Sequence, residues 1–438
     1  MTTTLDVAGP FPPRNSAHLP SVRWVIGIAF ALMASALLLL TLQWQIPLML
    51  WDHLDLVPIY DDFLHDALRW SDFFRIHGGH LHSAAYAVLL ITTFASGGHP
   101  WLDCVVSWAL LLVYAALIAG SVLALVRKTH VGVALPLLIV FLALFPGHLA
   151  NLQWGWQVAV FLCLVGMVGV VRLLSAPNLS ILHMALALLC ALLACSSFAI
   201  GIAVLPTAVV LIALRGELAW TRRGYYALPW LAAGAAYVAL LERGASSSSL
   251  HWQEVCLYVL NFLGAGVARF ATDVAPWLGA GAIVSGLWTI RLLHRRPETL
   301  CWTGYFLVVI MSAFLVAYGR AGSYGADHAF VTRYVSFSSL FWIGWLGLMA
   351  HAHAAGTLRP PHARILLSVI GAFAVFNGVH LMKKASQVSE HAHDVAQEIR
   401  QTYPNVRPAI LGEIYFDQPD VARQRLSMLH AWGFAPFD

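Results

Sequence analysis

The chain has 438 residues, of which 60% are hydrophobic and only 11% are charged, and its formal net charge at pH 7 is +4. Soluble globular proteins are about a quarter charged, so the composition indicates a polytopic membrane protein and excludes an ordinary soluble enzyme. The small positive charge is not gathered into a basic block, which argues against nucleic acid as a partner. The six cysteines lack CxxC spacing, so neither a disulfide framework nor a zinc site is expected.

Apolar runs along the chain predict eleven membrane-spanning helices. The first covers 24–46 and follows a polar, proline-rich segment; it is too long for the apolar part of a signal peptide, so a membrane anchor is expected. The other ten are expected near 101–126, 132–147, 152–174, 179–195, 201–214, 224–241, 275–294, 302–318, 333–352 and 364–382. Two shorter apolar segments, 83–97 and 252–269, are predicted to be re-entrant or interfacial helices.

The distribution of lysine and arginine predicts a cytoplasmic N-terminus. With that orientation, thirteen basic residues fall on the inner side and six fall on the outer side before the tail. The inner set is Arg14, Arg23, Arg127, Lys128, Arg172, Arg215, Arg222, Arg223, Arg291, Arg295, Arg296, Arg359 and Arg364, and the outer set is Arg69, Arg75, Arg243, Arg269, Arg320 and Arg333. We therefore expect a cytoplasmic segment 1–23, a transmembrane catalytic domain 24–383 and an extracytoplasmic helical tail 384–438. Because its helices are amphipathic, the tail is expected to pack over the outer surface.

Four polar segments fall on the outer side in this topology. The first, YDDFLHDALRWSDFFRIHGGHLHS at 60–83, concentrates aspartates and histidines in a chain that has few charges. The others are FPGHLANLQWGWQ at 145–157, CSSFAIG at 195–201 and YGRAGSYGADHAFVTRY at 318–334. Their common side predicts a single extracytoplasmic active-site cavity.

The residue types in these segments suit group transfer from an anionic lipid. Asp61 or Asp62 is the candidate general base toward an acceptor hydroxyl. Arg320 and Arg333 are candidates for binding a carrier phosphate through paired hydrogen bonds. The candidate substrate-binding residues are His77, His80, Trp154, Trp156, Gln157 and Tyr324.

Most of these residues also have a structural explanation. The two aspartates can be solvated loop acids, Trp154 and Trp156 can belong to an interfacial aromatic belt, and Arg333 can reach lipid headgroups. The histidines of HGGH lack a clear third ligand, so no metal site is predicted. A nucleotide-phosphate loop, a GxSxG elbow and an HExxH motif are all missing from the sequence. This disfavours cytosolic nucleotide-sugar enzymes and the common hydrolases.

In combination, the motifs resemble the GT-C superfamily of membrane glycosyltransferases, and more narrowly a bacterial branch of such membrane proteins. The resemblance rests on PIYDDF at 58–63, HGGH at 77–80, WGWQ at 154–157, GR at 319–320, TRY at 332–334 and GFAPF at 433–437. That branch reads roughly His-Asn-Glu-His-Arg where this chain has His77 to Leu81. Gly78, Gly79 and Leu81 depart from the pattern, which makes Asp61 or Asp62 the better candidate base.

The resemblance implies an all-α, GT-C-like fold with a catalytic aspartate in the first outer loop. It predicts a glycosyltransferase of the bacterial cytoplasmic (inner) membrane that moves a sugar from a polyprenyl-phosphate carrier to an extracytoplasmic envelope glycan or lipid acceptor. Some members use a divalent metal, but no cofactor is predicted because the sequence shows no clear ligand set. Two alternatives stay open. A transporter or flippase of a lipid-linked saccharide would need a polar path through both leaflets, and a glycan polymerase or ligase would share the outer-loop arginines.

Overall fold

The structure is a computed structural model that describes residues 19–129, 131–240 and 251–437. The predicted cytoplasmic segment 1–23 lies outside the described residues as far as residue 18. Helices make up 81% of the protein, and the described strands are the two-residue β1 (Ile76–His77) and β2 (His80–Leu81), which pair antiparallel. The predicted all-α class is therefore confirmed.

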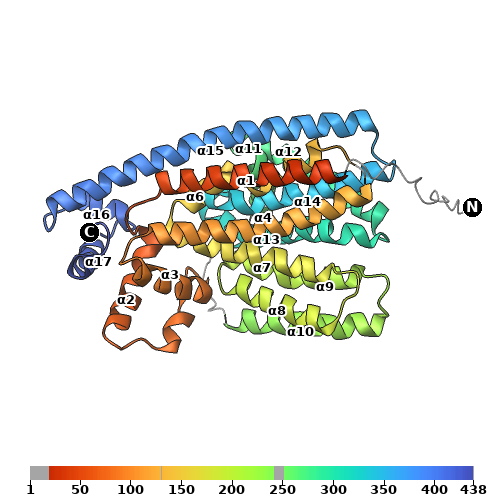
Figure 1. Cartoon of the computed structure of the whole chain (residues 1–438). Helices are drawn as coiled ribbons and strands as arrows, with labels where there is room; N and C mark the ends of the chain where they lie inside the picture. Colours follow the sequence, from red (N-terminus) through yellow and green to blue (C-terminus); the bar gives the residue numbers. More distant parts are fainter. Residues whose placement is uncertain (1–18, 130, 241–250, 438) are drawn as a thin grey trace, which may run out of the picture.

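Twelve of the described helices form a bundle with a common axis (Figure 1). They are α1 (Leu19–Gln43), α4 (Trp101–Thr129), α5 (Ala134–Ala143), α7 (Val158–Leu174), α8 (Ile181–Cys195), α9 (Val204–Leu214), α10 (Trp220–Leu240), α11 (Trp252–Ala268), α12 (Ala275–Leu293), α13 (Leu300–Tyr324), α14 (Val335–Ala354) and α15 (Pro360–Thr402). The other α-helices are α2 (Val57–Leu64), α3 (Ser83–Ala95), α6 (Leu149–Leu152), α16 (Pro408–Ile414) and α17 (Pro419–Trp432). Single 3₁₀ turns cover Trp51–Leu56, Trp70–Phe74, Pro146–His148, Gly155–Gln157, Ala199–Ala203, Pro297–Thr299, Ala326–Phe330 and Thr332–Tyr334.

Seven helical segments of the described chain are long and apolar enough to cross a membrane. They are Val22–Gln43, Trp101–Thr129, Ala134–Leu152, Gly155–Leu174, Pro297–Tyr324, Thr332–Ala354 and Pro360–Thr402, and each contains most or all of one predicted span. The other four predicted spans also form helices. However, α8 has 15 residues and α9 has 11, whereas a bilayer needs about 20. The protein has the helices of a multi-pass membrane protein, and eleven spans stay a prediction.

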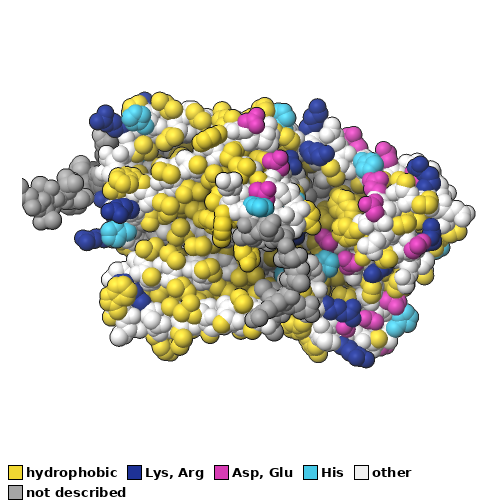
Figure 2. Space-filling model, turned by 180° about the vertical axis from the view of Figure 1, so that it is seen from behind, with side chains coloured by type: hydrophobic (Ala, Val, Ile, Leu, Met, Phe, Trp, Pro, Cys, Tyr) yellow, Lys and Arg dark blue, Asp and Glu magenta, His cyan; other side chains and the backbone are white. Residues whose placement is uncertain are grey.

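The bundle has two chemically different ends. In Figure 2, hydrophobic side chains cover the middle, one end shows lysine and arginine without acidic neighbours in view, and the opposite end shows aspartate and glutamate mixed with lysine and arginine. We call these the basic end, where α4, α7 and α9 finish, and the acidic end, which carries the outer loop (residues 44–82) and the tail (residues 403–437). Leu32, Leu189 and Val284 on the middle belt are 67%, 62% and 70% exposed, which is the surface expected to face lipid.

Helix α15 continues without a break across the predicted boundary between 383 and 384. Its 43 residues span about 65 Å at 1.5 Å per residue, roughly twice the hydrocarbon thickness of a bilayer. The far half projects past the bundle, and α16 and α17 fold back beneath it toward the outer loop (Figure 1). Trp51 Nε1 donates to the Glu413 carbonyl at 2.9 Å, and Arg425 Nη1 donates to the Leu54 carbonyl at 3.1 Å. The tail therefore packs against residues 51–54, and its extracytoplasmic position stays a prediction.

Candidate functional site

The polar segments that were predicted to share one side do meet at the acidic end. His82, at the end of the outer loop, donates from Nδ1 to the Ser197 carbonyl at 2.8 Å, which joins the outer loop to the α8–α9 turn. The rings of His77 and Trp156 lie 5.3 Å apart, which joins the outer loop to the segment before α7. Residues distant in sequence therefore form one continuous polar cluster.

His77 lies between two carboxylates. Its Nε2 is 3.1 Å from Asp52 Oδ1, and its Nδ1 is 3.7 Å from Asp55 Oδ2. Burial alone would lower the pKa of His77, but the hydrogen bond from Asp52 and the charges of both aspartates outweigh burial and raise it. The Tyr415 hydroxyl also donates to Asp55, and Arg425 Nη2 lies 4.0 Å from Asp55. The side chains of Asp52, Asp55 and His77 keep 24%, 25% and 22% exposure, so a substrate can reach them.

Two local structures place this group. Asp52 and Asp55 are three residues apart on a 3₁₀ turn, which has three residues per turn, so both carboxylates lie on one face. The intervening Leu54 is fully buried and anchors the turn. On the opposite side, Gly78 and Gly79 have φ angles of +56° and +85°. Two consecutive positive φ values are what a tight two-residue hairpin requires, and glycine adopts them without steric cost.

Histidines connect this group to Arg320. His80 is 9% exposed, and its ring lies 4.3 Å from that of His82. The pKa of His80 is lowered to about 4, first by burial and then by the charges of His77 and Arg320, while the Gly78 carbonyl and Asp52 oppose this shift. His80 therefore lies within electrostatic reach of both Asp52 and Arg320, and it is neutral at physiological pH.

Arg320 and Arg333 both lie within electrostatic reach of His328. Burial first, and then both arginine charges, lower the pKa of His328 to about 4. The Tyr258 hydroxyl is 3.0 Å from His328 Nδ1. The ring of Tyr324 stacks on His328 at 4.7 Å, and the Arg320 guanidinium lies 5.7 Å from the Tyr324 centroid. Within the described residues, neither arginine has a carboxylate at ion-pair distance.

The aromatic segment before α7 is more buried than its predicted sugar-lining role requires. Trp154 is 8% exposed, and Trp156 and Gln157 are each 2% exposed. Trp156 packs against the histidines, with its ring 5.2 Å from that of His82. Trp154 Nε1 and Gln157 Oε1 are buried without a hydrogen-bond partner in the described part of the chain. Of this aromatic group, Trp51, which meets Trp154 edge to face at 5.3 Å, is more accessible at 37% exposure.

The two predicted base candidates lie apart from the histidine cluster, on α2. The Asp61 carboxylate is 39% exposed and pairs with His65 at 3.2 Å. The Asp62 carboxylate is 36% exposed and lies 3.7 Å from Arg75. Both have the environment of solvated surface acids, which was the alternative explanation for them.

Sequence reasoning missed Asp52 and Asp55. The signal was available, because Trp51–Leu56 reads WDHLDL and spaces the two acids by three residues just before the PIYDDF motif. It also missed Tyr415 and Arg425, whose contacts with Asp55 come from the far end of the chain.

The same group supplies the cation ligand set that the sequence did not reveal. Asp52, Asp55 and His77 each offer one ligand atom, and these atoms lie within 4.8 Å of one another. Carboxylate oxygen with imidazole nitrogen is a donor set that suits divalent cations such as Mn²⁺ and Zn²⁺. The three side chains therefore fit a cation, and they also fit proton transfer without one.

In comparisons with known proteins, no protein-family model matches the chain and no curated protein matches its sequence.

Proposed function

We propose that the protein is a membrane glycosyltransferase of GT-C type that transfers a sugar from a polyprenyl-phosphate carrier to an envelope glycan or lipid acceptor. The reaction would take place at the acidic end, on the extracytoplasmic side of the bacterial cytoplasmic membrane. One observation carries the proposal: the accessible Asp52 carboxylate and Arg320 both lie within electrostatic reach of the buried His80, and Arg333 lies with Arg320 around His328.

The reaction needs a base for the acceptor hydroxyl and a cation for the departing phosphate, and this arrangement offers both. Asp52 takes the proton of the acceptor hydroxyl while the acceptor oxygen forms a bond to the sugar carbon. The bond between that carbon and the carrier phosphate breaks, and the departing phosphate gains negative charge. Arg320 and Arg333 bind that phosphate, because two guanidinium groups donate fixed pairs of hydrogen bonds to phosphate oxygens. The phosphate of the bound donor then neutralises the positive charge that the two arginines bring to the site.

Asp52 is the better base candidate than Asp55 because its carboxylate is less committed. Asp55 accepts the Tyr415 hydroxyl and lies near Arg425, whereas the described contact of Asp52 is with His77. His77 can hold the Asp52 carboxylate in position and accept charge when the proton moves. The role predicted for Asp61 or Asp62 thus passes to an aspartate of the same loop.

An apolar groove supports a lipid donor. A cavity of about 310 Å³ lies between α9, α11 and α13, and Pro206, Trp252, Phe314 and Tyr318 are among its lining residues. Phe314 and Tyr318 are 46% and 66% exposed, and Tyr318 precedes Arg320 by two residues on α13. A polyprenyl chain in this groove would bring its phosphate toward Arg320.

The test is mass spectrometry of envelope glycans and lipid-linked sugars from cells with and without the gene. Loss of one glycan substituent together with accumulation of one polyprenyl-phosphate-linked sugar is expected. The purified protein should then release carrier phosphate from that sugar donor. Unchanged glycans and unchanged lipid-linked sugars would contradict the proposal.

A flippase for a lipid-linked saccharide is a second candidate, and one observation favours it. A cavity of about 1130 Å³ lies at the basic end, so polar space is not confined to the acidic end. Proteoliposomes separate the two functions. A flippase moves a fluorescent lipid-linked saccharide between leaflets without changing it, whereas a transferase cleaves the sugar from its carrier.

A further inference from the structure

The cavity at the basic end carries an excess of positive charge. It lies where α4, α7 and α9 finish and where α8, α10 and α13 begin, and its volume is about 1130 Å³. Six basic residues line it against two glutamates, Glu217 and Glu298. The basic residues are Lys128, Arg172, Arg215, Arg223, Arg295 and Arg296.

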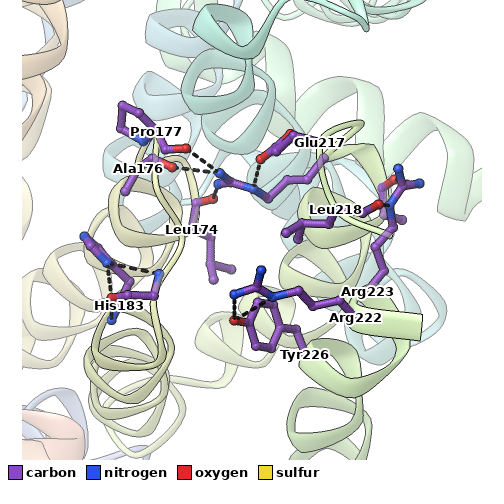
Figure 3. A network of polar contacts seen from close by, with 12 residues as sticks. Leu174, Ala176, Pro177, His183, Glu217, Leu218, Arg222, Arg223 and Tyr226 are labelled. Carbon is purple, nitrogen blue, oxygen red and sulfur yellow. Dashed lines mark hydrogen bonds and ion pairs between the residues drawn. The ribbon is translucent and has the colours of Figure 1, made fainter. Parts of the chain in front are cut away.

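Two of these arginines already have their hydrogen bonds within the protein. Figure 3 shows one guanidinium surrounded by the carbonyls of Leu174, Ala176 and Pro177 and by Glu217. This is Arg215, which is 4% exposed and donates to those carbonyls at 2.6, 2.9 and 3.1 Å. Arg223 likewise donates to two backbone carbonyls and lies over the Trp220 ring. Arg215 thus joins the α7–α8 and α9–α10 turns, and Arg223 joins the start of α10 to the end of α9.

Arg172 is different. Its guanidinium donates from Nη1 to the Ser121 hydroxyl at 2.8 Å, and Ser121 is in turn 3.1 Å from the Tyr305 hydroxyl. A Cβ atom at Gly120 would lie 3.4 Å from Arg172 Nη2, so the glycine leaves space beside the guanidinium. In the described residues, Arg172 has no carboxylate within ion-pair distance. Among the described hydrogen bonds its guanidinium makes the one to Ser121, and Arg172 lines the cavity.

Arg172 lies in the last turn of α7, and because it lines the cavity its positive charge is available to an anionic ligand there. Much of the remaining wall is apolar and includes Leu117, Val165, Leu173 and Leu300. Lys128, Arg296, Glu298 and His351 line the same cavity. Cationic donors beside an apolar wall match a molecule with a phosphoryl group and a hydrocarbon chain.

We propose that the basic-end cavity binds a phosphoryl anion carried by a lipid, with Arg172 as its inner anchor and Lys128, Arg295 and Arg296 at its rim. The volume slightly exceeds that of typical small-molecule pockets, so a headgroup and the first part of its chain fit. This site is independent of sugar transfer at the acidic end. In the predicted topology it faces the cytoplasmic leaflet.

The test uses the full chain in detergent micelles and the fluorescence anisotropy of a labelled phosphatidic acid. Labelled phosphatidylcholine is the control ligand, and inorganic pyrophosphate is a soluble competitor. Arg172→Gln should weaken phosphatidic acid binding about 10- to 100-fold, because charge-assisted hydrogen bonds are lost. The matched control is Arg127→Gln, which removes one exposed charge at the same end but outside the cavity lining; its affinity should stay within about twofold.

The outcomes separate the sources of the phosphoryl group. Competition by pyrophosphate supports recognition of the phosphoryl group alone, and phosphatidic acid binding without such competition supports a lipid ligand. Equal losses of phosphatidic acid affinity in Arg172→Gln and Arg127→Gln would mean that the basic end attracts lipid headgroups without a specific site, and would overturn the proposal. If Arg172→Gln does not remain monodisperse, Arg296→Gln at the rim replaces it. Unchanged phosphatidic acid binding in that variant would equally overturn the proposal.

Discussion

Replacing Asp52 by asparagine tests the proposed active site at its most specific point. The Asp52 carboxylate is 24% exposed, and its Oδ1 is 3.1 Å from His77 Nε2. Asparagine has nearly the same shape and keeps a hydrogen bond to His77, but it cannot accept a proton at neutral pH. General-base catalysis contributes about 10²–10⁴-fold, so Asp52→Asn should slow transfer by that factor, equivalent to about 2.7–5.5 kcal/mol of activation free energy.

Asp61→Asn is the matched control because it makes the same chemical change in the same loop. Its partner His65 has a side chain that is 68% exposed, and an exposed pair of this kind is worth about 0–1 kcal/mol of stability. Transfer should therefore stay within about twofold of the unsubstituted protein. The assay measures carrier release by purified protein in nanodiscs, with the lipid-linked sugar that accumulates in cells lacking the gene. Circular dichroism and gel filtration verify folding.

The reverse pattern, with Asp61→Asn inactive and Asp52→Asn active, would refute the geometric reasoning and return the base to α2. Chelation separates two roles for Asp52. If Asp52, Asp55 and His77 hold a required cation, a chelator should abolish transfer and Mn²⁺ should restore it. If Asp52 acts as a base without a cation, transfer should withstand the chelator while Asp52→Asn remains inactive.

Three further predictions concern arginines and one histidine. Arg333→Lys and Arg320→Lys should each impair donor turnover almost as much as alanine does, since lysine keeps the charge and loses the paired donors; full activity of both lysine variants would return these residues to headgroup contacts. Arg215→Ala should lower the free energy of unfolding by about 3 kcal/mol, because three carbonyls lose their donor. Arg223→Ala should cost less, because Arg223 is only half-buried and donates to two carbonyls. Unfolding in sodium dodecyl sulfate measures both losses, and equal losses would contradict the hydrogen-bond account. The pKa of His328 is about 4 in the folded protein and 6.5 in the unfolded chain. The unfolded state therefore binds an extra proton between these values, and the folded state loses stability as pH falls through that window. His328→Gln should make the thermal unfolding temperature fall less between pH 7 and pH 4, and an unchanged pH dependence would show that another group is responsible.

The fold was predictable where the physical signal is local. A run of about 20 apolar residues can satisfy its backbone only as a helix in lipid, and the spans that became α4, α13 and α14 were found on that basis. The charge bias also predicted that the outer loop and the Arg320–Arg333 loop share one side. In the structure the two loops are neighbours, since Arg320 lies within electrostatic reach of His80 in the outer loop. Span number was less predictable, since short helices such as α9 carry the same composition as long ones.

The site was predictable only in part because its contacts are distant in sequence. Tyr415 and Asp55 are 360 residues apart, and His77 and Asp52 are 25 residues apart. Sequence motifs favour adjacent acids such as Asp61 and Asp62 as the catalytic base, yet both side chains can point toward solvent from the helix that carries them. Burial is equally hidden: Trp156 reads as a sugar platform, but the histidines that surround it leave 2% of its surface exposed.

The arginines of the basic end show how one sequence signal can contain two different functions. The positive-inside rule counts Arg172 and Arg215 alike, because it depends only on which side of the membrane a charge occupies. In the structure, Arg215 donates its hydrogen bonds to three carbonyls and Glu217, so this arginine stabilises the fold. Arg172 has a hydroxyl partner and a cavity in front of it. The same bias that orients the chain can thus conceal a binding site, and only the hydrogen bonds of each arginine separate one role from the other.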